Sequence, residues 1–396
     1  MKTDNISKPY ILTVNAGSSS IKLAAFTAQP LQKQFEVAVE NLGQPSASLV
    51  TPDGRTPLTI SDHTDAASAL LQWLSLQIAR ADVAAVGHRI VHGGPKYSRA
   101  TGVTNALLDD LHELAVFDPE HLPAELKLIG IFQRFLPSAQ QVACFDTAFH
   151  HNLPMRSQLV PLPRRLANQG VRRYGFHGLS YAYIVEELRR VEGDAAAHGK
   201  VIVAHLGSGA SLAALEDGRP IDTTMSMTPT SGIPMSTRSG DLDPGLMFYL
   251  ASTQRYSAEQ LHHMVNFESG LLGISETSAD MKQLLASEKT DARAKDAIDI
   301  FCYNVTKTIG SYAAALGGLH TLVFTGGMGE NAPKIRTRIC TSLAFLGVQL
   351  DDVRNQASER LISVAGAPVG VHVIHTDEAV TIARETFTIT TENGEH

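Results

Sequence analysis

The sequence contains few cysteines, and they lie far apart. Cys144, Cys302 and Cys340 are the only three in 396 residues, and none belongs to a CxxC pair. Such sparse cysteines argue against a disulfide framework and indicate a reducing compartment. Residues 1–9 lack the apolar stretch of a signal peptide, and no run reaches the ~18 apolar residues of a membrane-spanning helix. We therefore expect a cytoplasmic protein that does not bind a membrane.

An excess of positive charge is also missing. The chain has 33 Lys and Arg against 40 Asp and Glu, a net charge of −7, which makes nucleic acid an unfavourable partner. The GxxxxGK[ST] phosphate loop and the HExxH zinc motif are absent, so we expect neither a P-loop nor a structural zinc. With 43% apolar and 18% charged residues the composition is globular, and the length favours two domains.

Short apolar runs alternate with amphipathic segments along the chain. Strand-like runs at 10–14 and 21–26 flank a turn of small residues, which predicts a β-hairpin. Apolar residues within 66–80 recur at helical spacing. Further strands are expected at 83–91, 141–145, 200–204, 211–215 and 322–324, and further helices at 291–316 and 333–346. This mixture of strands and helices indicates an α/β fold.

One short pattern occurs twice. Gly17-Ser18 followed by Leu23-Ala24-Ala25-Phe26 resembles Gly207-Ser208 followed by Leu212-Ala213-Ala214-Leu215, with one residue fewer between the parts of the second copy. Each copy has the pattern of a strand, a glycine–serine turn and a strand. Although a match this short can arise by chance, the repeat predicts two related domains, each contributing one such loop to a shared cleft.

Three loops rich in glycine or serine are candidates for binding phosphate. In 15–20 and 205–210 the small residues let backbone N–H groups approach phosphate oxygens, and Lys22 adds a positive charge. The third loop, 325–331, lies between an expected strand and an expected helix, whose N-terminus favours anions. An ordinary turn remains the alternative for each loop taken alone.

Four polar side chains are candidates for catalysis. Arg89 and Arg238 lie among Gly, Ser, His and Asp residues, and a guanidinium group binds carboxylate and phosphate through paired N–H donors. His177, next to Gly178, could hydrogen-bond a transferring phosphoryl group, and Asp146 ends an expected strand. Each of these residues, taken alone, also has a structural alternative. Either arginine could form a surface ion pair, and His177 could be a loop histidine bonded to the backbone. Asp146 could cap a helix.

Taken in order, these segments resemble acetate kinase. The resemblance rests on 15–22 (NAGSSSIK), 87–94 (GHRIVHGG), 145–150 (FDTAFH), 172–178 (RRYGFHG), 205–210 (HLGSGA), 237–243 (TRSGDLD), 269–275 (SGLLGIS), 278–280 (SAD), 324–331 (FTGGMGEN) and 376–378 (TDE). Each motif alone is weak, but the ordered set covers nearly the whole chain and is highly specific.

The resemblance implies a fold and an assembly. The fold would be two related ribonuclease H-like domains, as in actin, Hsp70 and sugar kinases, with an ATP cleft between them. The first domain would span 1–148 and be completed by the C-terminal segment 381–396, and the second, nucleotide-binding domain would span 149–380. A homodimer and a requirement for Mg²⁺, or Mn²⁺ in its place, are also implied.

The resemblance also implies roles for the matching residues. Arg89 and Arg238 would hold the carboxylate and the transferring phosphoryl group, and Asp146 would orient Arg89 or the acceptor. His177, helped by His205, would stabilise charge in the transition state.

Further matching residues would bind the remaining parts of the reactants. Val91, Phe176 and Pro229 would form the apolar pocket for the methyl group of the acid. Asn15 and Glu378 would help to place the metal ion. The nucleotide and its phosphates would meet Asn15, Ser18, Ser20, Lys22, His205, Leu206, Gly207, Ser208, Gly209, Asp280, Met281, Lys282, Gly327, Met328, Gly329 and Asn331.

The activity implied is reversible in-line transfer of the γ-phosphoryl group of ATP to acetate, giving acetyl phosphate and ADP. Propionate, or another short carboxylate, is the alternative acceptor, and a non-catalytic nucleotide-binding module is a third hypothesis. Several positions around the expected cleft depart from the family. Glu120 replaces a leucine of the acid pocket, and Thr230-Ser231 replaces Leu-Glu, so the preferred acid stays open. Tyr181 replaces a histidine of the family. The family also has other residues at positions 208, 236 and 282, and the effect of Ser208, Ser236 and Lys282 on the choice of phosphoryl donor stays open.

Overall fold

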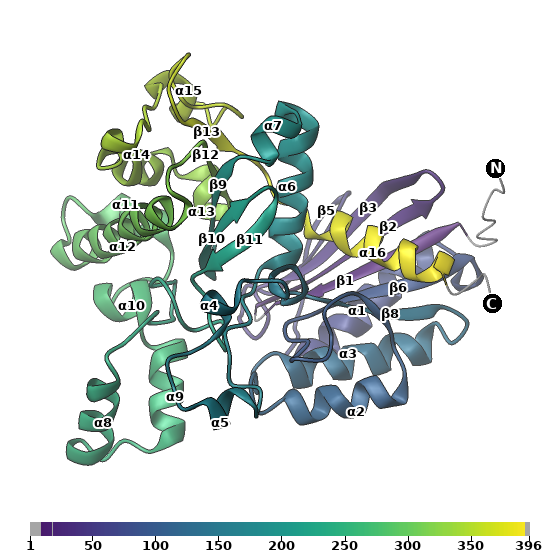
Figure 1. The fold of residues 1–396 in the computed structure, drawn as a ribbon. Coiled ribbons are helices and arrows are strands. Elements are labelled where there is room, and N and C mark those ends of the chain that lie inside the picture. Colours follow the sequence, from purple (N-terminus) through teal and green to yellow (C-terminus); the bar gives the residue numbers. More distant parts are fainter. Residues whose placement is uncertain (1–8, 18, 393–396) are drawn as a thin grey trace. The chain divides into compact units, whose positions relative to one another are not determined.

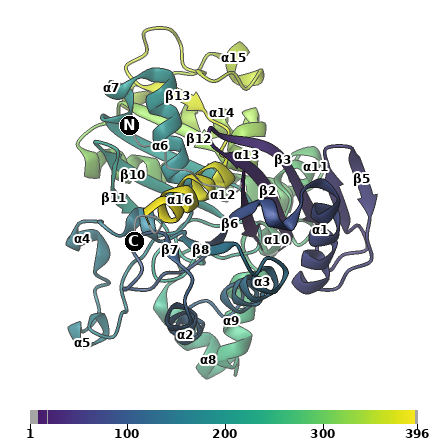
Figure 2. The same ribbon diagram turned by 90° about the vertical axis from the view of Figure 1, so that its right-hand side faces the viewer.

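The computed structural model describes residues 9–17 and 19–392 (Figure 1; Figure 2 shows the same ribbon turned by 90°). The chain divides into two compact units. Unit 1 comprises Met1–His151, Gly178–Tyr183 and Asp377–His396, and unit 2 comprises Asn152–His177 and Ile184–Thr376. The predicted domain limits, with breaks after 148 and 380, stay a prediction.

Unit 1 is built on a mixed β-sheet. Its strand order is β5-β4-β3-β2-β1-β6-β8-β7, with β1 antiparallel to β2 and parallel to β6, and β6 parallel to β8. The strands are β1 Tyr10–Ala16, β2 Ser20–Ala28, β3 Leu31–Glu40, β4 Ser48–Thr51, β5 Gly54–Pro57, β6 Val83–Ile90, β7 Thr101–Gly102 and β8 Gln140–Phe145. The helices are α1 His63–Gln77, α2 Asn105–Leu114, α3 Leu122–Phe135 and α16 Glu378–Glu392, with 3₁₀ turns at Arg80–Asp82 and Ala148–His150. The predicted hairpin of β1 and β2 is confirmed.

Alternating side chains of β2 explain how helices cover both faces of this sheet. Ile21, Leu23 and Ala25 are buried in one core with residues of α1 and α3, whereas Ala24 and Phe26 pack with Ala383 of α16. Successive side chains of a strand point to opposite faces, so α16 covers the face opposite to α1 and α3 (Figure 1).

α16 approaches β6 very closely, which explains a glycine in that strand. A Cβ atom at Gly87 would lie 2.1 Å from Oγ1 of Thr386 and 2.7 Å from a methyl group of Ile382. Only a residue without a side chain allows this approach. The last described helix is thus part of the core of unit 1.

Unit 2 contains a second, five-stranded sheet. Its strand order is β11-β10-β9-β12-β13, and α12 packs on β9 and β10. The strands are β9 Lys200–Leu206, β10 Ala210–Glu216, β11 Arg219–Thr223, β12 Thr321–Thr325 and β13 Gly370–Val373. The helices are α4 Met155–Gln158, α5 Arg164–Ala167, α6 Gly178–Glu192 (whose first residues belong to unit 1), α7 Asp194–Ala197, α8 Pro244–Thr253, α9 Ala258–Phe267, α10 Gly270–Ser275, α11 Met281–Ser287, α12 Ala292–Leu316, α13 Gly326–Asn331, α14 Pro333–Thr341 and α15 Asp352–Gln356, with a 3₁₀ turn at Ala344–Leu346.

The two sheets share one connectivity. The central strands β3-β2-β1-β6-β8 match β11-β10-β9-β12-β13 in order, and in both sheets the first three are antiparallel and the last two join in parallel. In the hairpins Ala16 pairs with Ile21, and Leu206 pairs with Ala210. The second turn is one residue shorter, which explains the single gap in the sequence repeat. The predicted α/β fold of two related ribonuclease H-like domains is confirmed.

Two expectations need correction. The segment 325–331, expected as a loop, is mostly the short helix α13, which begins at Gly326 with φ 76°. Glu330 folds back on the start of α13, because its Oε1 accepts hydrogen bonds from the N–H of Gly326 (2.9 Å) and from Oγ1 of Thr325 (3.3 Å). The helix expected to reach residue 346 ends at Thr341, and a 3₁₀ turn follows before Gly347 at φ 90°.

A fully buried arginine holds α13 to its neighbours. Nη1 of Arg336 donates to the carbonyl oxygens of Gly329 (2.8 Å) and Glu330 (2.9 Å). Its Nε and Nη2 donate to Oδ1 (2.8 Å) and to the carbonyl oxygen (2.7 Å) of Asn355. Burial lowers the pKa of Arg336 to about 10, so the guanidinium stays charged at neutral pH.

Two further observations bear on the sequence-based expectations. All three cysteines are free and buried. Within the part of the chain that the structure describes, no helix combines the length and the apolar character that crossing a membrane requires.

Candidate active site

In unit 1, Arg89 is fixed at the end of β6. Its Nε and Nη2 both donate to Oδ2 of Asp146, at 3.0 Å and 2.6 Å, and its Nη1 donates to the carbonyl oxygen of Ala16 at 2.8 Å. Asp146 directly follows β8, the parallel neighbour of β6, and is fully buried. Because Asp146 occupies one edge of the guanidinium, a ligand would reach Arg89 at the edge formed by Nη1 and Nη2. Asp146 therefore orients Arg89.

A second buried carboxylate lies on the other side of Arg89. Glu125, in the first turn of α3, places Oε1 at 3.7 Å from Nη1 of Arg89. Its Oε2 accepts a hydrogen bond from the N–H of Val91 at 2.9 Å. Glu125 is only 3% exposed, and the sequence analysis did not single it out.

Asn15 and Glu378 also meet in unit 1. Nδ2 of Asn15 donates to Oε2 of Glu378 at 2.6 Å. Asn15 is on β1 and pairs with Lys22 of β2, whereas Glu378 is the first residue of α16. Ser20 begins β2, and Ser18 lies outside the described residues.

Three carboxyl groups and one arginine influence one another in this cluster. Burial by itself lowers the pKa of Arg89, but the carboxylates of Asp146, Glu125 and Glu378 outweigh this effect and raise it. Burial, followed by the charge of Asp146, raises the pKa of Glu378, against the opposing effects of Arg89, Asn15 and Lys22. Burial raises the pKa of both Glu125 and Glu378, and a bound cation would favour the ionised form of a carboxyl group beside it.

In unit 2, two histidines stack beside the turn between β9 and β10. The rings of His177 and His205 are 4.3 Å apart at 22°, and Nδ1 of His177 lies 2.8 Å from Oγ of Ser211. His177 precedes α6 with φ 57°. Ser211 pairs with His205 across the hairpin. The serine thereby fixes the ring of His177 and directs Nε2 away from β10.

Gly209, in the same turn, lies between His177 and Arg238. A Cβ atom at Gly209 would be 3.2 Å from Nε2 of His177 and 3.4 Å from Nη1 of Arg238. Both nitrogens therefore converge on the turn 207–209. Nη1 of Arg238 also donates to the carbonyl oxygen of Pro229 at 3.2 Å. A glycine here keeps the space beside these two polar groups open.

The structure also locates the three residues expected to form the apolar acid pocket, and two residues that depart from the family. Val91 and Phe176 are buried, and Pro229 is half-buried. The hydroxyl of Thr230 donates to Oδ1 of Asn266, and that of Ser231 donates to the carbonyl oxygen of Thr228. These two hydroxyls are therefore used in hydrogen bonds within unit 2.

The remaining departures lie on loops or helix ends. The N–H of Ser236 donates to the carbonyl oxygen of Ser208 at 3.2 Å, a contact that does not depend on either side chain. Glu120 is half-buried in the segment before α3, and Tyr181 is fully buried in α6.

The other nucleotide candidates belong to two helix starts of unit 2. Oδ1 of Asp280 caps α11 by accepting from the N–H of Lys282 at 2.8 Å. Met281 is buried in the core, and Lys282 is exposed. Gly327, Met328, Gly329 and Asn331 belong to α13, where Nδ2 of Asn331 donates to the carbonyl oxygen of Gly327. Leu206, at the end of β9, is fully buried, so only its backbone could meet a ligand.

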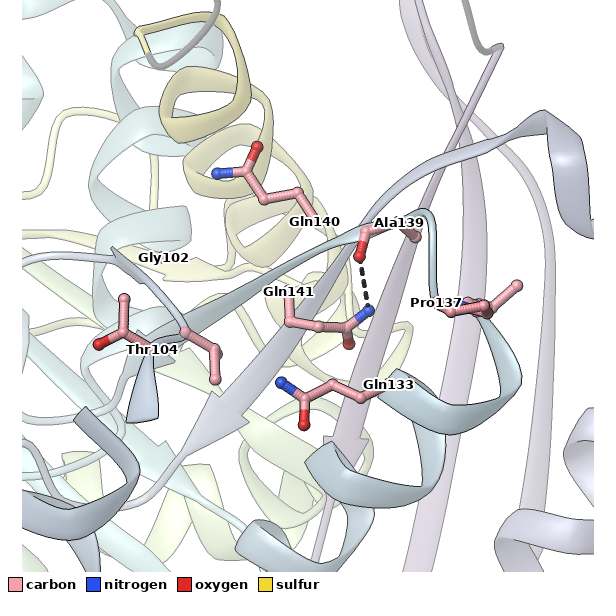
Figure 3. Close-up of a pocket in the computed structure, with 9 residues that line it drawn as sticks. Gly102, Thr104, Gln133, Pro137, Ala139, Gln140 and Gln141 are labelled. Carbon is pink, nitrogen blue, oxygen red and sulfur yellow. Dashed lines mark hydrogen bonds between the residues drawn. The ribbon is translucent and has the colours of Figure 1, made fainter. Parts of the chain in front are cut away.

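Two pockets lie apart from these residues. One, of about 500 Å³ in unit 1, is lined by β7, β8 and the end of α3. Figure 3 shows Gln133 and Gln141 on the same side of β8, with Nε2 of Gln141 bonded to the carbonyl oxygen of Ala139, whereas Gln140 points to the other side. The other, of about 370 Å³ in unit 2, lies between α12 and the segment 222–241. No candidate site residue lines either pocket.

The structure adds two residues that the sequence analysis missed, Glu125 and Ser211. Each acts on a predicted residue, Glu125 on Arg89 and Ser211 on His177. A sequence signal existed for Ser211, because it begins the strand expected at 211–215, directly after the candidate phosphate loop 205–210. Glu125 has the appearance of an ordinary acidic residue in the first turn of a helix.

Comparison with known proteins relates the chain to one family. Residues 10–384 match the model of the acetokinase family. An acetate kinase of Rhodopseudomonas palustris (strain TIE-1) is 43% identical over 389 residues, which cover 95% of this chain and 97% of that protein.

Solved structures agree with this relation. A propionate kinase from Francisella tularensis superposes with a TM-score of 0.89 at 35% identity, covering 96% of this chain and 99% of that one. An acetate kinase from Porphyromonas gingivalis superposes with a TM-score of 0.84 at 35% identity and the same two coverages.

Proposed function

The chain belongs to the acetokinase family, and we propose that it transfers the γ-phosphoryl group of ATP reversibly to acetate, giving acetyl phosphate and ADP. Members of this family are phosphotransferases with a carboxylate acceptor, and relatives that span nearly the whole chain are named as acetate kinases. Both matches cover nearly the whole of each chain, which supports the same activity for this protein.

The observation that carries the proposal is the convergence of His177 and Arg238 on the glycine turn 207–209. A transferring phosphoryl group carries charge on three equatorial oxygens, which is stabilised by preorganised donors and cations. Nε2 of His177, the guanidinium of Arg238 and the N–H groups of a glycine turn are donors of this kind. His205 supports the ring of His177 by stacking.

Unit 1 supplies the groups that we assign to the acid. Arg89, oriented by Asp146, would bind the carboxylate or the transferring phosphoryl group, and Val91 would contact the methyl group. Phe176 and Pro229, which belong to unit 2, are proposed as further apolar contacts of the acid. A carboxylate is a nucleophile at neutral pH without a general base, so positioning and charge neutralisation have to supply the rate.

The chemical step is a direct displacement. A carboxylate oxygen of acetate attacks the γ-phosphorus in line with the bond to ADP, the new P–O bond forms, and the bond to the bridging oxygen of ADP breaks. Acetyl phosphate is itself a good phosphoryl donor, so the same groups support the synthesis of ATP in the reverse direction. His177 and Arg238 stabilise the charge in both directions.

A divalent cation fits the region around Asn15 and Glu378. Burial, and then the charge of Asp146, raises the pKa of Glu378, and a cation held there would stabilise its ionised form. The residues 9–17 and 19–392 hold no cluster of three or more His, Cys, Asp or Glu that could bind a metal alone. Mg²⁺ is usually bound through one or two protein carboxylates together with phosphate oxygens and water. We propose that Mg²⁺, or Mn²⁺, is held there and would neutralise phosphate charge.

We propose that ATP binds along the two glycine turns and α13. The phosphates would meet Ser18, Ser20 and Lys22 and the turn 207–209, and the adenosine would lie near Asp280 and 327–329. Because ATP and short carboxylates are cytoplasmic metabolites, we expect the enzyme to act there.

Acyl-phosphate formation tests the function. The protein is incubated with ATP, MgCl₂ and formate, acetate, propionate or butyrate, and the product is trapped as the hydroxamate with hydroxylamine. The highest kcat/KM is expected with acetate. Omission of the acid is the control for ATP hydrolysis. Absence of hydroxamate with all four acids would refute carboxylate kinase activity.

Propionate is the second candidate acceptor, because a propionate kinase is among the similar structures. An additional methylene group changes binding in an apolar pocket by only about 1–3 kcal/mol. The same assay decides between the acids, since a higher kcat/KM with propionate would change the substrate and leave the mechanism as proposed.

We further propose that the enzyme is a homodimer that associates through α8. None of the ten side chains of this helix, Pro244–Thr253, is buried. Three of them are nevertheless large and apolar or aromatic: Leu246 (41% exposed), Phe248 (74%) and Tyr249 (49%). An exposed apolar patch of this kind usually marks an interface.

Replacement of Phe248 with Glu should weaken the dimer, because it places a charge in an apolar contact. Light scattering coupled to size exclusion is expected to show a dimer for the wild type and a shift towards monomer for Phe248→Glu. Phe345→Glu is the matched control, because Phe345 is equally exposed (78%) but lies in the 3₁₀ turn after α14. A monomeric wild type, or equal effects of both variants, would refute this interface.

A further inference from the structure

Glu125 contacts both residues of unit 1 that we place against the acid. Its Oε2 accepts from the N–H of Val91 at 2.9 Å, and its Oε1 lies 3.7 Å from Nη1 of Arg89. The second distance is that of an ion pair without a hydrogen bond. Glu125 therefore acts on the substrate region through Arg89 and Val91 and does not need to touch the substrate itself.

The charge of Glu125 matters because other carboxylates already balance the positive charge of Arg89. Asp146 binds Nε and Nη2 of Arg89, and Glu378 also acts on its charge. With Glu125 ionised as well, three negative charges would surround one positive charge. An anionic substrate would then meet net repulsion at Arg89, whereas a neutral Glu125 removes one of these negative charges.

Burial favours the neutral form of Glu125. It raises the pKa of Glu125 to about 8, an effect that Asp118 and Asp146 increase and that Arg89 and the N–H of Val91 oppose. Arg89 faces Glu125 from β6, Asp146 from the end of β8 and Asp118 from the segment before α3. His121, which bonds Asp118 through Nδ1 at 2.9 Å, and His92, next to Val91, are the titratable neighbours in these segments.

We propose that Glu125 is a positioning residue whose own charge controls how strongly Arg89 binds the carboxylate of the substrate. This proposal rests on the proposed function, because it takes a carboxylate as the substrate at Arg89. At neutral pH, Glu125 is protonated and Arg89 attracts the acid. Above pH 8, Glu125 loses its proton and the attraction weakens, so the enzyme binds its acid less tightly in alkaline conditions.

Glu125→Gln separates charge from packing. Glutamine keeps an oxygen that can accept from the N–H of Val91 but carries no charge at any pH. The KM of the wild type for acetate is expected to rise about tenfold between pH 7 and pH 9. This is the change expected if acetate binds only the enzyme in which Glu125, with a pKa of about 8, is protonated. The KM of Glu125→Gln is expected to stay constant over this range and to match the wild type at pH 7 within about twofold.

Glu385→Gln is the matched control. Glu385 is another acid of unit 1 whose pKa is raised to about 7, by burial and to a smaller extent by Asp146. It belongs to α16, which covers the opposite face of the sheet, whereas the hydrogen bonds of Arg89 go to Asp146 and Ala16. This variant is expected to keep the pH dependence of the wild type. If Glu125→Gln instead lowered kcat equally at every pH, or kept the rise in KM, Glu125 would have only a structural role and the proposal would be wrong.

A binding measurement distinguishes failure of this proposal from failure of the proposed function. Ligand-observed NMR of acetate and propionate with the same three proteins requires no turnover. Affinity that falls with pH in the wild type and in Glu385→Gln, but not in Glu125→Gln, supports the role of Glu125 even without phosphoryl transfer. Affinity that is independent of pH in the wild type overturns this proposal and leaves the proposed function standing. An absence of binding at pH 7 would refute the carboxylate substrate and therefore both proposals.

Discussion

Arg89→Ala is expected to lower kcat/KM for acetate by roughly 10³-fold or more, the range found for arginines that stabilise phosphoryl transfer. Arg89 is held by Asp146 and by the carbonyl oxygen of Ala16, so its direction is set before substrate binds. Alanine removes both the charge and the donors. Steady-state kinetics with acetate and ATP measure the effect.

Two controls accompany this variant. Arg99→Ala removes an exposed arginine of the same unit and is expected to leave kcat/KM unchanged within about twofold. Added guanidinium ion is expected to restore part of the activity of Arg89→Ala, because it can occupy the space between Asp146 and the substrate. A loss smaller than tenfold would show that Arg89 does not bind the reacting groups.

Arg336→Met is expected to destabilise unit 2 by roughly 3 kcal/mol or more, because each buried acceptor left without its donor costs about 1–3 kcal/mol. The acceptors are the carbonyl oxygens of Gly329 and Glu330 and two oxygens of Asn355. The midpoint of urea unfolding, followed by circular dichroism, measures the change.

Arg338→Met provides the comparison from the same helix, α14. Arg338 is partly exposed and forms an ion pair with Glu288, so its loss should cost no more than about 1 kcal/mol. Equal shifts for the two variants would mean that the hydrogen bonds of Arg336 do not stabilise unit 2. A larger KM for ATP in Arg336→Met is also expected, since α13 would lose its anchor.

Local patterns in the sequence predicted the parts of the fold that depend on neighbours along the chain. The hairpin of β1 and β2 and that of β9 and β10 each follow from two apolar runs around a turn of small residues. The glycine-rich segment after β12 was harder to predict, because its helical form depends on Glu330 folding back on the N–H of Gly326. Glycines alone indicate a loop.

In the candidate site, too, local motifs were predictable from the sequence, and contacts between distant segments were not. Motifs identified Arg89, Asp146, His177 and Arg238, and the structure places Asp146 on Arg89 and places Arg238 and His177 around Gly209. Glu125 could not be identified in this way, because its role depends on α3 packing against β6, a contact across 34 residues. The effect of burial on its pKa likewise becomes visible only in the folded chain.

The position of α16 in the chain has a consequence for biosynthesis. This helix covers one face of the sheet of unit 1, packing Ala383 on Ala24 and Phe26, and its first residue is Glu378. It leaves the ribosome only after all of unit 2. While unit 2 is being translated, we therefore expect the nascent sheet to expose an apolar face, a surface of the kind that chaperones bind. A ribosome stalled before codon 378 would hold a chain that has no closed first domain and no Glu378 to join the catalytic groups.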